Sequence, residues 1–248
     1  MRENDSALDR HRGNALLSAL PGPSLAALEP HLTLTTLERG RIVQESGEPV
    51  REALFPQRGT ISLLGLTRDG RAAEAAIVGP DGFVGFWAVL GSESTSLTRA
   101  LVQMPGAASR ISVDALNAAA EADPALRDIL LRFTKVLLKQ ALQTIACNAL
   151  HPIAARCARW LLVAHDRQGR DRDQIDITQA SLALMTGVSR QTLSTATRAF
   201  QDRRLFRIER GRVVVLDRAG LEAVACECYG TLLLAREAIL PASARGAS

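Results

Sequence analysis

A predicted helix that begins after Ser189 has polar and basic side chains at the spacing of one helical face. Arg190 lies at its start, and Gln191, Thr195 and Arg198 follow on the face opposite the apolar residues. An Arg fork can bind O6 and N7 of guanine, a Gln amide can bind N6 and N7 of adenine, and a Thr can reach a phosphate or a thymine methyl group. The pattern therefore predicts a helix that reads base edges in a DNA major groove.

The elements that must hold this helix in place are also visible in the sequence. Thr178 is a good N-cap for a first helix, Gly187 ends that helix at a turn where a positive φ is favourable, and Ser189 caps the second helix. Leu182 and Met185 are expected to face inward from the first helix. On the second helix the residues expected to face inward are Leu193, Ala196 and Phe200.

A hairpin with a basic tip is predicted after the two helices. Two β-prone runs flank Glu209-Arg210-Gly211-Arg212, and a hairpin in this position is a wing that can touch phosphates. A structural bundle could imitate any one of these parts, but not easily the whole series in this order. A hydrolase would need a Ser or Cys with a nearby His, and no such motif is present, so no enzymatic activity is predicted.

Composition is consistent with a DNA-binding protein. Residues 150–248 hold 15 Arg against 10 Asp and Glu, whereas the rest of the chain is close to neutral. An excess of positive charge in one domain suits a phosphate-binding surface, although a bias in genome composition also explains the preference for Arg. No apolar run is long enough to span a bilayer and no secretory signal is seen, so a cytoplasmic location without membrane contact is expected.

The cysteines suggest neither a disulfide framework nor a metal centre. None lies in the first 146 residues, and no Cys-x-x-Cys motif occurs. Cys226 and Cys228 fall in a predicted helix over Arg218–Leu240, where residues two apart point in different directions, so one metal ion could not easily use both. Buried thiols are the expected role; the alternative of metal or redox chemistry predicts bound metal or a titratable thiolate. No metal or cofactor is predicted.

The N-terminal part has the texture of an antiparallel β-roll. From about Arg39 to Val113, short apolar runs alternate with Gly and Pro, which predicts roughly eight short strands, with an Asp69-Gly70 hairpin between two of them. The fold class is therefore α+β. The predicted domains are a roll with flanking helices over 1–122, a long helix over 123–148 and a DNA-binding domain over 149–248.

The long helix is predicted to pair with a second copy of the chain. Pro124 follows Asp123, a plausible N-cap, and apolar residues then recur at the 4-3-4-3 spacing of a coiled coil. Packing of this seam within one chain is the alternative. The predicted dimer interface is Leu126, Leu130, Phe133, Leu137 and Gln140.

This arrangement of roll, long helix and winged helix-turn-helix resembles the Crp/Fnr superfamily of bacterial transcription regulators, most closely at Ile177–Leu216, where Thr178-Gln179 and Val188–Thr192 match its DNA-reading region. The resemblance implies phosphate contacts by Thr178 and Gln179, and a homodimer on a near-palindromic site in double-stranded DNA, with RNA polymerase as a further partner. The predicted DNA-binding residues are Thr178, Gln179, Ser189, Arg190, Gln191, Thr192, Thr195, Arg198, Arg210 and Arg212.

The resemblance fails where cyclic-nucleotide-binding members hold their ligand. Those members place Glu after the last Gly of the segment matched by Gly82–Gly85, but here Phe86 follows, and the phosphate-binding Arg is missing near Ser94-Thr95. Control by cyclic AMP is therefore not expected. Apolar side chains either fill the former site or line a pocket for a less polar effector, with Phe86, Trp87 and Arg99 as the candidate residues. An effector-binding module with vestigial DNA binding is the competing function.

Overall fold

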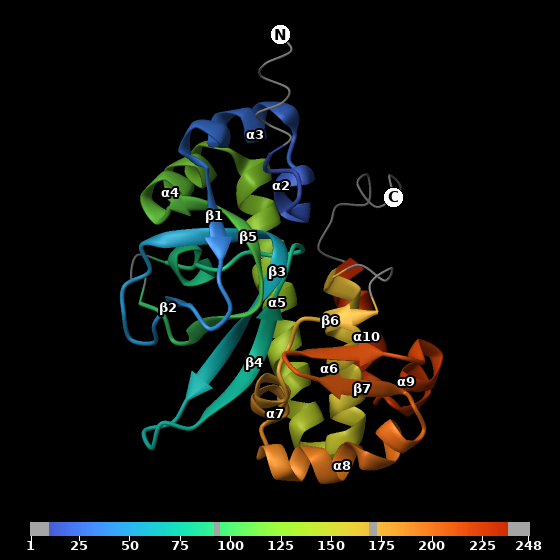
Figure 1. Ribbon diagram of the computed structural model, residues 1–248. Helices are drawn as coiled ribbons and strands as arrows, with labels where there is room; N and C mark the ends of the chain where they lie inside the picture. Colours follow the sequence, from blue (N-terminus) through green and yellow to red (C-terminus); the bar gives the residue numbers. More distant parts are fainter. Residues whose placement is uncertain (1–9, 92–94, 169–172, 238–248) are drawn as a thin grey trace. The chain divides into compact units, whose positions relative to one another are not determined.

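The computed structural model describes residues 10–91, 95–168 and 173–237 (Figure 1). It has the α+β class expected from the sequence, with an antiparallel sheet followed by helices and a small second sheet. Two compact units divide the chain. The first comprises Met1–Leu63, Ile77–Lys139 and Ala235–Ser248, and the second comprises Leu64–Ala76 and Gln140–Leu234.

The roll contains fewer and longer strands than the sequence predicted. Within the described residues one sheet has five strands in the order β1-β5-β3-β4, and β2 also pairs with β5. β1 and β2 run antiparallel to β5. The strands are β1 (Thr33–Leu37), β2 (Ile42–Gln44), β3 (Glu52–Leu66), β4 (Ala72–Val78) and β5 (Arg99–Ser112).

Two glycines inside the long strands explain why the expected number of strands was too high. Gly59 of β3 has φ +83°, and a Cβ there would lie 2.5 Å from the Met104 carbonyl oxygen. A Cβ on Gly106 of β5 would lie 2.1 Å from the Arg58 carbonyl oxygen. These glycines therefore allow close approach of two strand backbones, a role that glycine also has inside strands, and they are not turns between separate strands.

The Asp-Gly hairpin is confirmed. Gly70 has φ +81°, its N–H donates to the Thr67 carbonyl at 2.9 Å, and the Thr67 N–H donates to the Arg71 carbonyl at 2.9 Å. Positive φ at the glycine of a short loop is the reason that Asp-Gly predicts a hairpin. β3 and β4 flank this turn.

The helices of the first unit complete the core of the roll. Phe83 stacks on Phe55 with ring centroids 5.3 Å apart and lies 5.2 Å from Phe133 of the long helix. Gly82 is required here, because a Cβ would lie 2.2 Å from the Phe133 ring. The elements are α2 (Ala15–Ser18), α3 (Gly22–Leu28), η1 (Glu29–His31), η2 (Phe86–Val89), α4 (Val113–Ala122) and α5 (Pro124–Leu150), the last of which continues into the second unit.

The second unit is built around α6 (Ile153–Gln168), which is buried on every side from Arg156 to His165. The Trp160 indole N–H donates to a Glu74 carboxylate oxygen at 2.8 Å, so the tip of the β3–β4 hairpin belongs to this unit. The other elements are β6 (Gln174–Ile175), α7 (Gln179–Thr186), α8 (Arg190–Asp202), β7 (Phe206–Glu209), β8 (Arg212–Val215), α9 (Arg218–Val224) and α10 (Cys228–Glu237), with the strands in the order β6-β8-β7.

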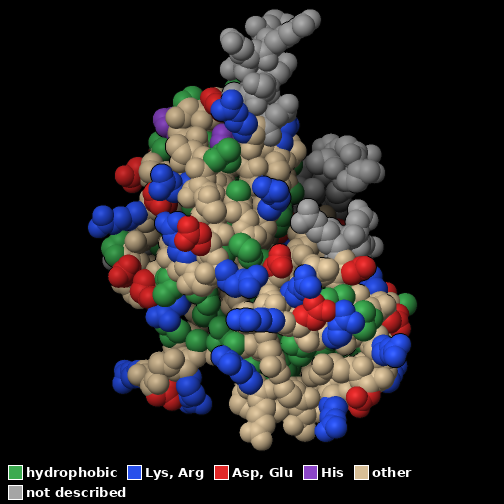
Figure 2. Space-filling view, in the orientation of Figure 1, with side chains coloured by type: hydrophobic (Ala, Val, Ile, Leu, Met, Phe, Trp, Pro, Cys, Tyr) green, Lys and Arg blue, Asp and Glu red, His purple; other side chains and the backbone are tan. Residues whose placement is uncertain are grey.

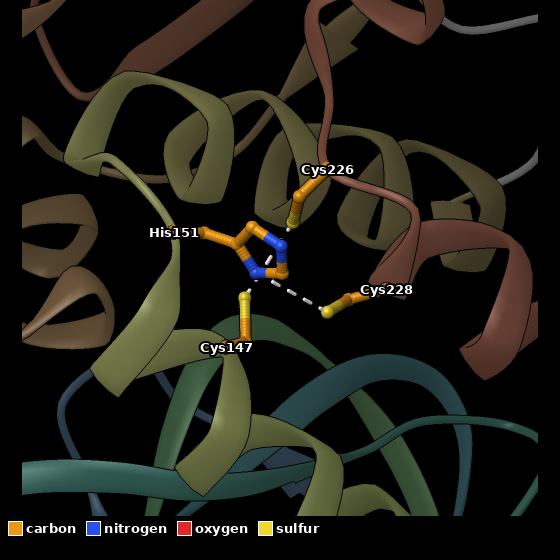
Figure 3. Close-up of side chains that lie close together, drawn as sticks. All are labelled: Cys147, His151, Cys226 and Cys228. Atoms are coloured by element: carbon orange, nitrogen blue, oxygen red, sulfur yellow. Dashed lines mark hydrogen bonds between the residues drawn. The ribbon is translucent and has the colours of Figure 1, made fainter.

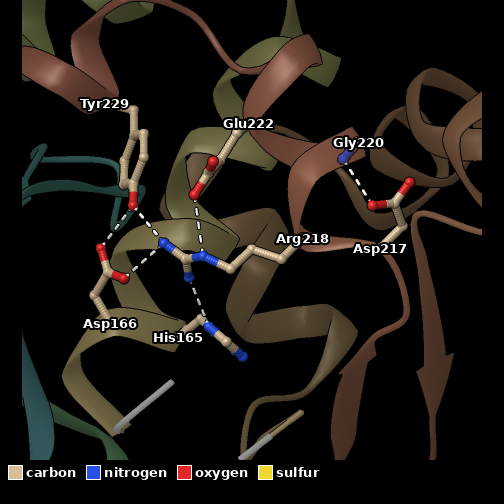
Figure 4. A network of polar contacts seen from close by, with 7 residues as sticks. All are labelled: His165, Asp166, Asp217, Arg218, Gly220, Glu222 and Tyr229. Atoms are coloured by element: carbon tan, nitrogen blue, oxygen red, sulfur yellow. Dashed lines mark hydrogen bonds and ion pairs between the residues drawn. The ribbon is translucent and has the colours of Figure 1, made fainter. Parts of the chain in front are cut away.

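A polar network around Arg218 fixes α9 and α10 to α6 (Figure 4). Its guanidinium donates to Asp166 at 2.9 Å, to the Tyr229 hydroxyl at 2.7 Å and to His165 Nδ1 at 2.7 Å. Glu222 is a further partner at 3.0 Å. Burial, together with the hydrogen bond to Asp166, raises the pKa of Tyr229 to about 12, so the phenol remains a donor in this network.

The single helix predicted over Arg218–Leu240 is wrong. The helix ends at Val224, Ala225 adopts the extended conformation, and a new helix begins at Cys228. Residues after Glu237 lie outside the described part of the chain. Cys226 therefore lies in a connection between two helices, and its side chain need not diverge from that of Cys228 as it would on one continuous helix.

Candidate nucleic-acid interface

The first helix of the pair, α7, has the caps predicted from the sequence. The Thr178 hydroxyl accepts from the Ser181 N–H at 3.0 Å, and Gly187 ends the helix with φ +68°. Leu182 and Met185 are buried, as expected. The N-cap and the left-handed glycine thus set both ends of α7 and direct the chain into the next helix.

The second helix, α8, begins at a confirmed N-cap, but its buried face differs from the prediction. The Ser189 hydroxyl accepts from the Thr192 N–H at 3.1 Å. Leu193 is buried, whereas Ala196 is only half-buried. Thr197, four residues after Leu193, is fully buried because its hydroxyl donates to the Leu193 carbonyl at 2.9 Å and needs no other partner. Phe200, also expected to be buried, is half-buried.

The outward face of α8 presents the predicted base-reading residues. Arg190, Gln191, Thr195 and Arg198 are exposed, and neither arginine forms an ion pair with any other described residue. The Thr195 hydroxyl donates to the Gln191 carbonyl at 3.1 Å, which leaves its oxygen lone pairs and methyl group facing outward. Thr192, also in the predicted set, is exposed and its hydroxyl pairs with that of Ser189 at 2.8 Å.

Gln179 and Ser194 join the two helices. The Gln179 amide donates to the Ser194 hydroxyl, and both side chains are half-buried. Gln179 is a predicted phosphate contact, and in this structure its amide helps to fix the position of α8 against α7. Thr178, the other expected phosphate contact, is half-buried and is occupied in capping.

The wing forms as predicted, but its charge is partly neutralised. In the pairing of β7 with β8, Phe206 lies opposite Val215 and Glu209 lies opposite Arg212. Gly211 turns the chain between the two strands with φ +80°. Glu209 binds Arg212 and Arg207, each at 2.6 Å, and these contacts lower the pKa of its carboxyl group. Arg212 also donates to Gln174 at 3.0 Å, whereas Arg210 at the tip is exposed and forms no ion pair with the described residues.

The arrangement combines the two kinds of contact that DNA recognition requires. The N-terminus of α8 supplies backbone N–H groups and a positive helix dipole for phosphate, with no acidic residue in the first turn to oppose it. The exposed Arg, Gln and Thr side chains have the donors and acceptors for base edges. On the face that Figure 2 draws, basic side chains lie among acidic ones, so here the exposed residues of α8 identify the candidate surface better than charge does.

The candidate effector residues do not form an open anion site. Phe86 is buried with its ring centroid 4.6 Å from that of Trp87, and Trp87 packs against a cluster that includes Val50. The Arg99 guanidinium binds both carboxylate oxygens of Glu45, at 2.9 and 3.1 Å. Ser94 lies outside the described residues.

The predicted dimer seam is not an open surface. Leu126, Leu130, Phe133, Leu137 and Gln140 are all at most 8% exposed within the single chain. The 4-3-4-3 spacing was correct for an apolar face, but this face packs inside the chain, as the contact of Phe133 with Phe83 shows. The exposed large apolar residues of α5 are Leu138 (60%), Leu142 (58%), Ile145 (66%) and, at its last position, Leu150 (76%).

No helix in the described part of the chain is sufficiently long and apolar to cross a membrane.

Comparison with known proteins gives a consistent set of similarities. Residues 155–224 match the family described as the Crp-like helix-turn-helix domain. A CRP-like cAMP-activated global transcriptional regulator of Mycobacterium tuberculosis is 26% identical over 199 residues, which is 78% of this chain and 88% of that protein.

Solved structures of low sequence identity share the fold. FixK2 from Bradyrhizobium japonicum has a TM-score of 0.66 at 17% identity and covers 79% of this chain and 98% of its own. The c-di-GMP responsive global regulator CLP from Xanthomonas campestris has a TM-score of 0.63 at 17% identity. The match covers 79% of this chain and 99% of the CLP chain.

Proposed function

We propose that this chain, a member of the Crp/Fnr superfamily of transcription regulators, binds a near-palindromic DNA operator as a homodimer that cyclic AMP does not control. The observation that carries the proposal is the exposed face of α8, where Arg190, Gln191 and Thr195 project beside a capped helix N-terminus. These residues supply base contacts, with Arg190 on guanine and Gln191 on adenine.

Phosphate contacts come from groups around the reading face. Ser189 and Thr192 lie at the N-terminus of α8, Arg198 extends the exposed face, and Arg210 lies at the wing tip. Arg212 contributes once DNA phosphates compete with Glu209 for its guanidinium. Thr178 and Gln179 act mainly by positioning α7 and α8, since their polar atoms are already used for this purpose.

A second copy of this chain covers the exposed apolar stripe of α5, formed by Leu138, Leu142 and Ile145. The 4-3 spacing of these residues is that of a coiled-coil seam. Two such protomers place two α8 helices in successive major grooves, about 34 Å apart. This is the symmetry that a near-palindromic site requires.

The roll supports control by something other than cyclic AMP. A cyclic phosphate needs a free cation, but Arg99 is paired with Glu45, and the pocket beside it at residues 43–52 is lined by Glu45, Glu48 and Glu52 against Arg51. Phe86 occupies the position of the expected ribose-binding Glu and is buried. Cyclic AMP, which activates the Mycobacterium tuberculosis relative, is therefore not the effector of this chain.

The proposed function includes a cellular location and a further protein partner. The chain acts in the cytoplasm without catalysis, and RNA polymerase is its further partner once it is bound to DNA. The predicted domain division at 122–123 and 148–149 places the roll before α5 and the DNA-binding domain after it.

Selection of binding sites from a randomised DNA library tests the function directly. Purified protein should enrich one near-palindromic sequence with two half-sites, and the Arg190→Ala variant should enrich a less defined sequence at the matching positions. Failure of the wild-type chain to enrich any sequence would instead support an effector-binding module with vestigial DNA binding.

A further inference from the structure

Three cysteines and a histidine converge in the second unit (Figure 3), and none of them belongs to α7, α8 or the wing. Cys147, Cys226 and Cys228 are buried, and His151 is half-buried. The Sγ atoms and one imidazole nitrogen all lie within 4.8 Å of one another. Four soft or borderline ligands around one point are the donor set of a transition-metal site.

The local fold brings these residues together from two segments that are far apart in the sequence. Cys147 lies in the last turn of α5, and His151 follows one turn later, with its N–H donating to the Cys147 carbonyl at 3.1 Å. Cys226 lies in the connection between α9 and α10, and Cys228 is the first residue of α10. The break in the helix allows both thiols to face the end of α5.

Two of the distances between donor atoms are close to those around a tetrahedral ion, and none exceeds 4.8 Å. With Zn–S near 2.3 Å and Zn–N near 2.05 Å, a tetrahedron has S–S edges of about 3.8 Å and S–N edges of about 3.6 Å. The Sγ atoms of Cys147 and Cys226 are 3.5 Å apart, and Cys228 Sγ lies 3.6 Å from His151 Nδ1. Donors this close suit a single ion, whereas an iron–sulfur cluster holds its ligands further apart.

The surrounding residues orient the histidine and one thiol for this role. His151 Nε2 lies 3.0 Å from a Glu227 carboxylate oxygen. A carboxylate only accepts, so Nε2 carries the proton and Nδ1 directs its lone pair into the cluster. Gln143 Nε2 donates to Cys228 Sγ at 3.0 Å. A carboxylate behind a ligating imidazole is the usual outer partner of a protein-bound zinc ion.

The fourth cysteine of the chain provides an internal contrast. Cys157 is fully buried on α6 and lies outside the cluster, and burial raises the pKa of its thiol to about 12. The positive charge of Arg159, also on α6, acts on Cys147 of the cluster. Three thiolates and Zn²⁺ carry one net negative charge, which the buried Arg159 side chain can offset.

We propose that Cys147, His151, Cys226 and Cys228 bind one Zn²⁺ ion in a closed tetrahedral site. Four protein ligands leave no open coordination position, which is the composition of a structural and not a catalytic zinc site. The ion joins the end of α5 to the connection between α9 and α10 and thereby stabilises the fold of the second unit. The proposal is independent of DNA binding and of any effector in the roll.

Metal analysis of the full chain, purified under a thiol reductant without added metal, tests the site. About one zinc per chain is expected for wild type and for Cys157→Ala, which removes a buried thiol outside the cluster. Cys228→Ala and Cys147→Ala should each lower the zinc content at least about tenfold. Cys228→His replaces one ligand by another and should retain zinc even if the alanine variant folds poorly.

Two measurements on the wild-type chain make the test independent of variant folding. Apoprotein prepared with a chelator should bind Co²⁺ with the thiolate charge-transfer absorption of a tetrahedral sulfur site, and zinc should abolish that absorption and raise the melting temperature. Glu227→Gln should weaken zinc affinity by about 10- to 100-fold while Glu222→Gln leaves it unchanged. Metal-free reduced wild type that takes up neither ion, or equal zinc content in wild type, Cys147→Ala and Cys228→Ala, would overturn the proposal. A Cys147–Cys226 disulfide in place of metal under the same reductant would do so as well.

Discussion

The roll and the winged helix differ in what the side chains of their candidate binding residues contact. On α8, Arg190 and Gln191 are exposed, and Arg190 has no ion-pair partner among the described residues. In the roll, Phe86 is buried against Trp87, and Arg99 is held by Glu45. The side chains of the winged helix are therefore available to a ligand, whereas the corresponding positions of the roll are used for packing and internal pairing.

The proposed absence of control by cyclic AMP rests on this difference, because a fold can persist after the residues that bind a ligand are lost. The fold of the roll requires only that its strands approach closely, as Gly59 and Gly106 allow. Ligand binding would in addition require a free cation and a ribose acceptor, which are separate residues and can be lost while the fold persists.

The largest effect is expected from disrupting the exposed stripe of α5. Leu142→Glu places a charge in the proposed protomer interface, so the protein should become monomeric and lose about 100-fold or more in operator affinity, because two linked half-site contacts become one. Sedimentation and fluorescence anisotropy measure the two quantities. Leu97→Glu, at a residue that is 67% exposed in the roll, is the matched control. A dimeric Leu142→Glu protein would place the interface elsewhere.

Loss of one base contact should have the next largest effect. Arg190→Ala should weaken binding to the selected operator by about 1–3 kcal/mol and relax the base preference at one position of each half-site. Arg127→Ala removes the same charge from the exposed surface of α5 and should do neither. Equal losses in both variants would mean that Arg190 contributes charge but no base readout.

Release of the paired arginines in the wing should increase affinity modestly. Glu209→Gln removes the partner of Arg207 and Arg212, so both become available to phosphates. Operator affinity should rise a few-fold, and the plot of log K against log salt concentration should become steeper by about one unit. Glu121→Gln on α4 should leave the slope unchanged. An unchanged slope for Glu209→Gln would show that Arg207 and Arg212 do not contact phosphates.

The smallest effect is expected in the roll. Addition of cyclic AMP should change operator affinity by less than about twofold, because a ligand that does not bind cannot shift an equilibrium between conformations. The fluorescence of Trp87 and Trp160 should likewise stay constant through the titration. Arg99→Ala should behave as wild type in both measurements. A saturable response to cyclic AMP that Arg99→Ala abolishes would mean that the roll binds cyclic AMP through Arg99.

The helix-turn-helix could be predicted closely because its signals are local. Thr178, Gly187 and Ser189 act on N–H or carbonyl groups within a few residues, so their roles follow from the sequence alone. The buried face of α8 was predicted less well: Thr197 is buried with its hydroxyl bonded to its own helix, whereas Ala196 and Phe200 are half-buried. A polar residue such as Thr197 is not expected on a buried face from its side-chain type alone.

The dimer seam shows the limit of periodicity. Leu126, Leu130 and Leu137 recur at coiled-coil spacing, but spacing identifies an apolar face and not the surface that covers it. Leu138, Leu142 and Ile145 have a similar spacing and are exposed. Only the contacts within the chain distinguish the two faces.

The cysteine cluster could not be predicted because it depends on a helix break and on a long-range contact. The connection at 225–227 contains neither Gly nor Pro, so nothing in the sequence ends the helix there. Cys147 and Cys226 are 79 residues apart, and no local pattern brings them together. Cys226-x-Cys228 and Cys147-x3-His151 were the available signals, and neither was sufficient alone.

Footprinting of the selected operator by hydroxyl-radical cleavage tests the central claim most directly. Wild-type protein should protect two segments with centres about 34 Å apart, in successive major grooves, and Arg190→Ala at saturating concentration should protect the same segments less selectively. A single protected segment, or protection of any DNA without regard to sequence, would contradict the claim that two copies of α8 read this operator.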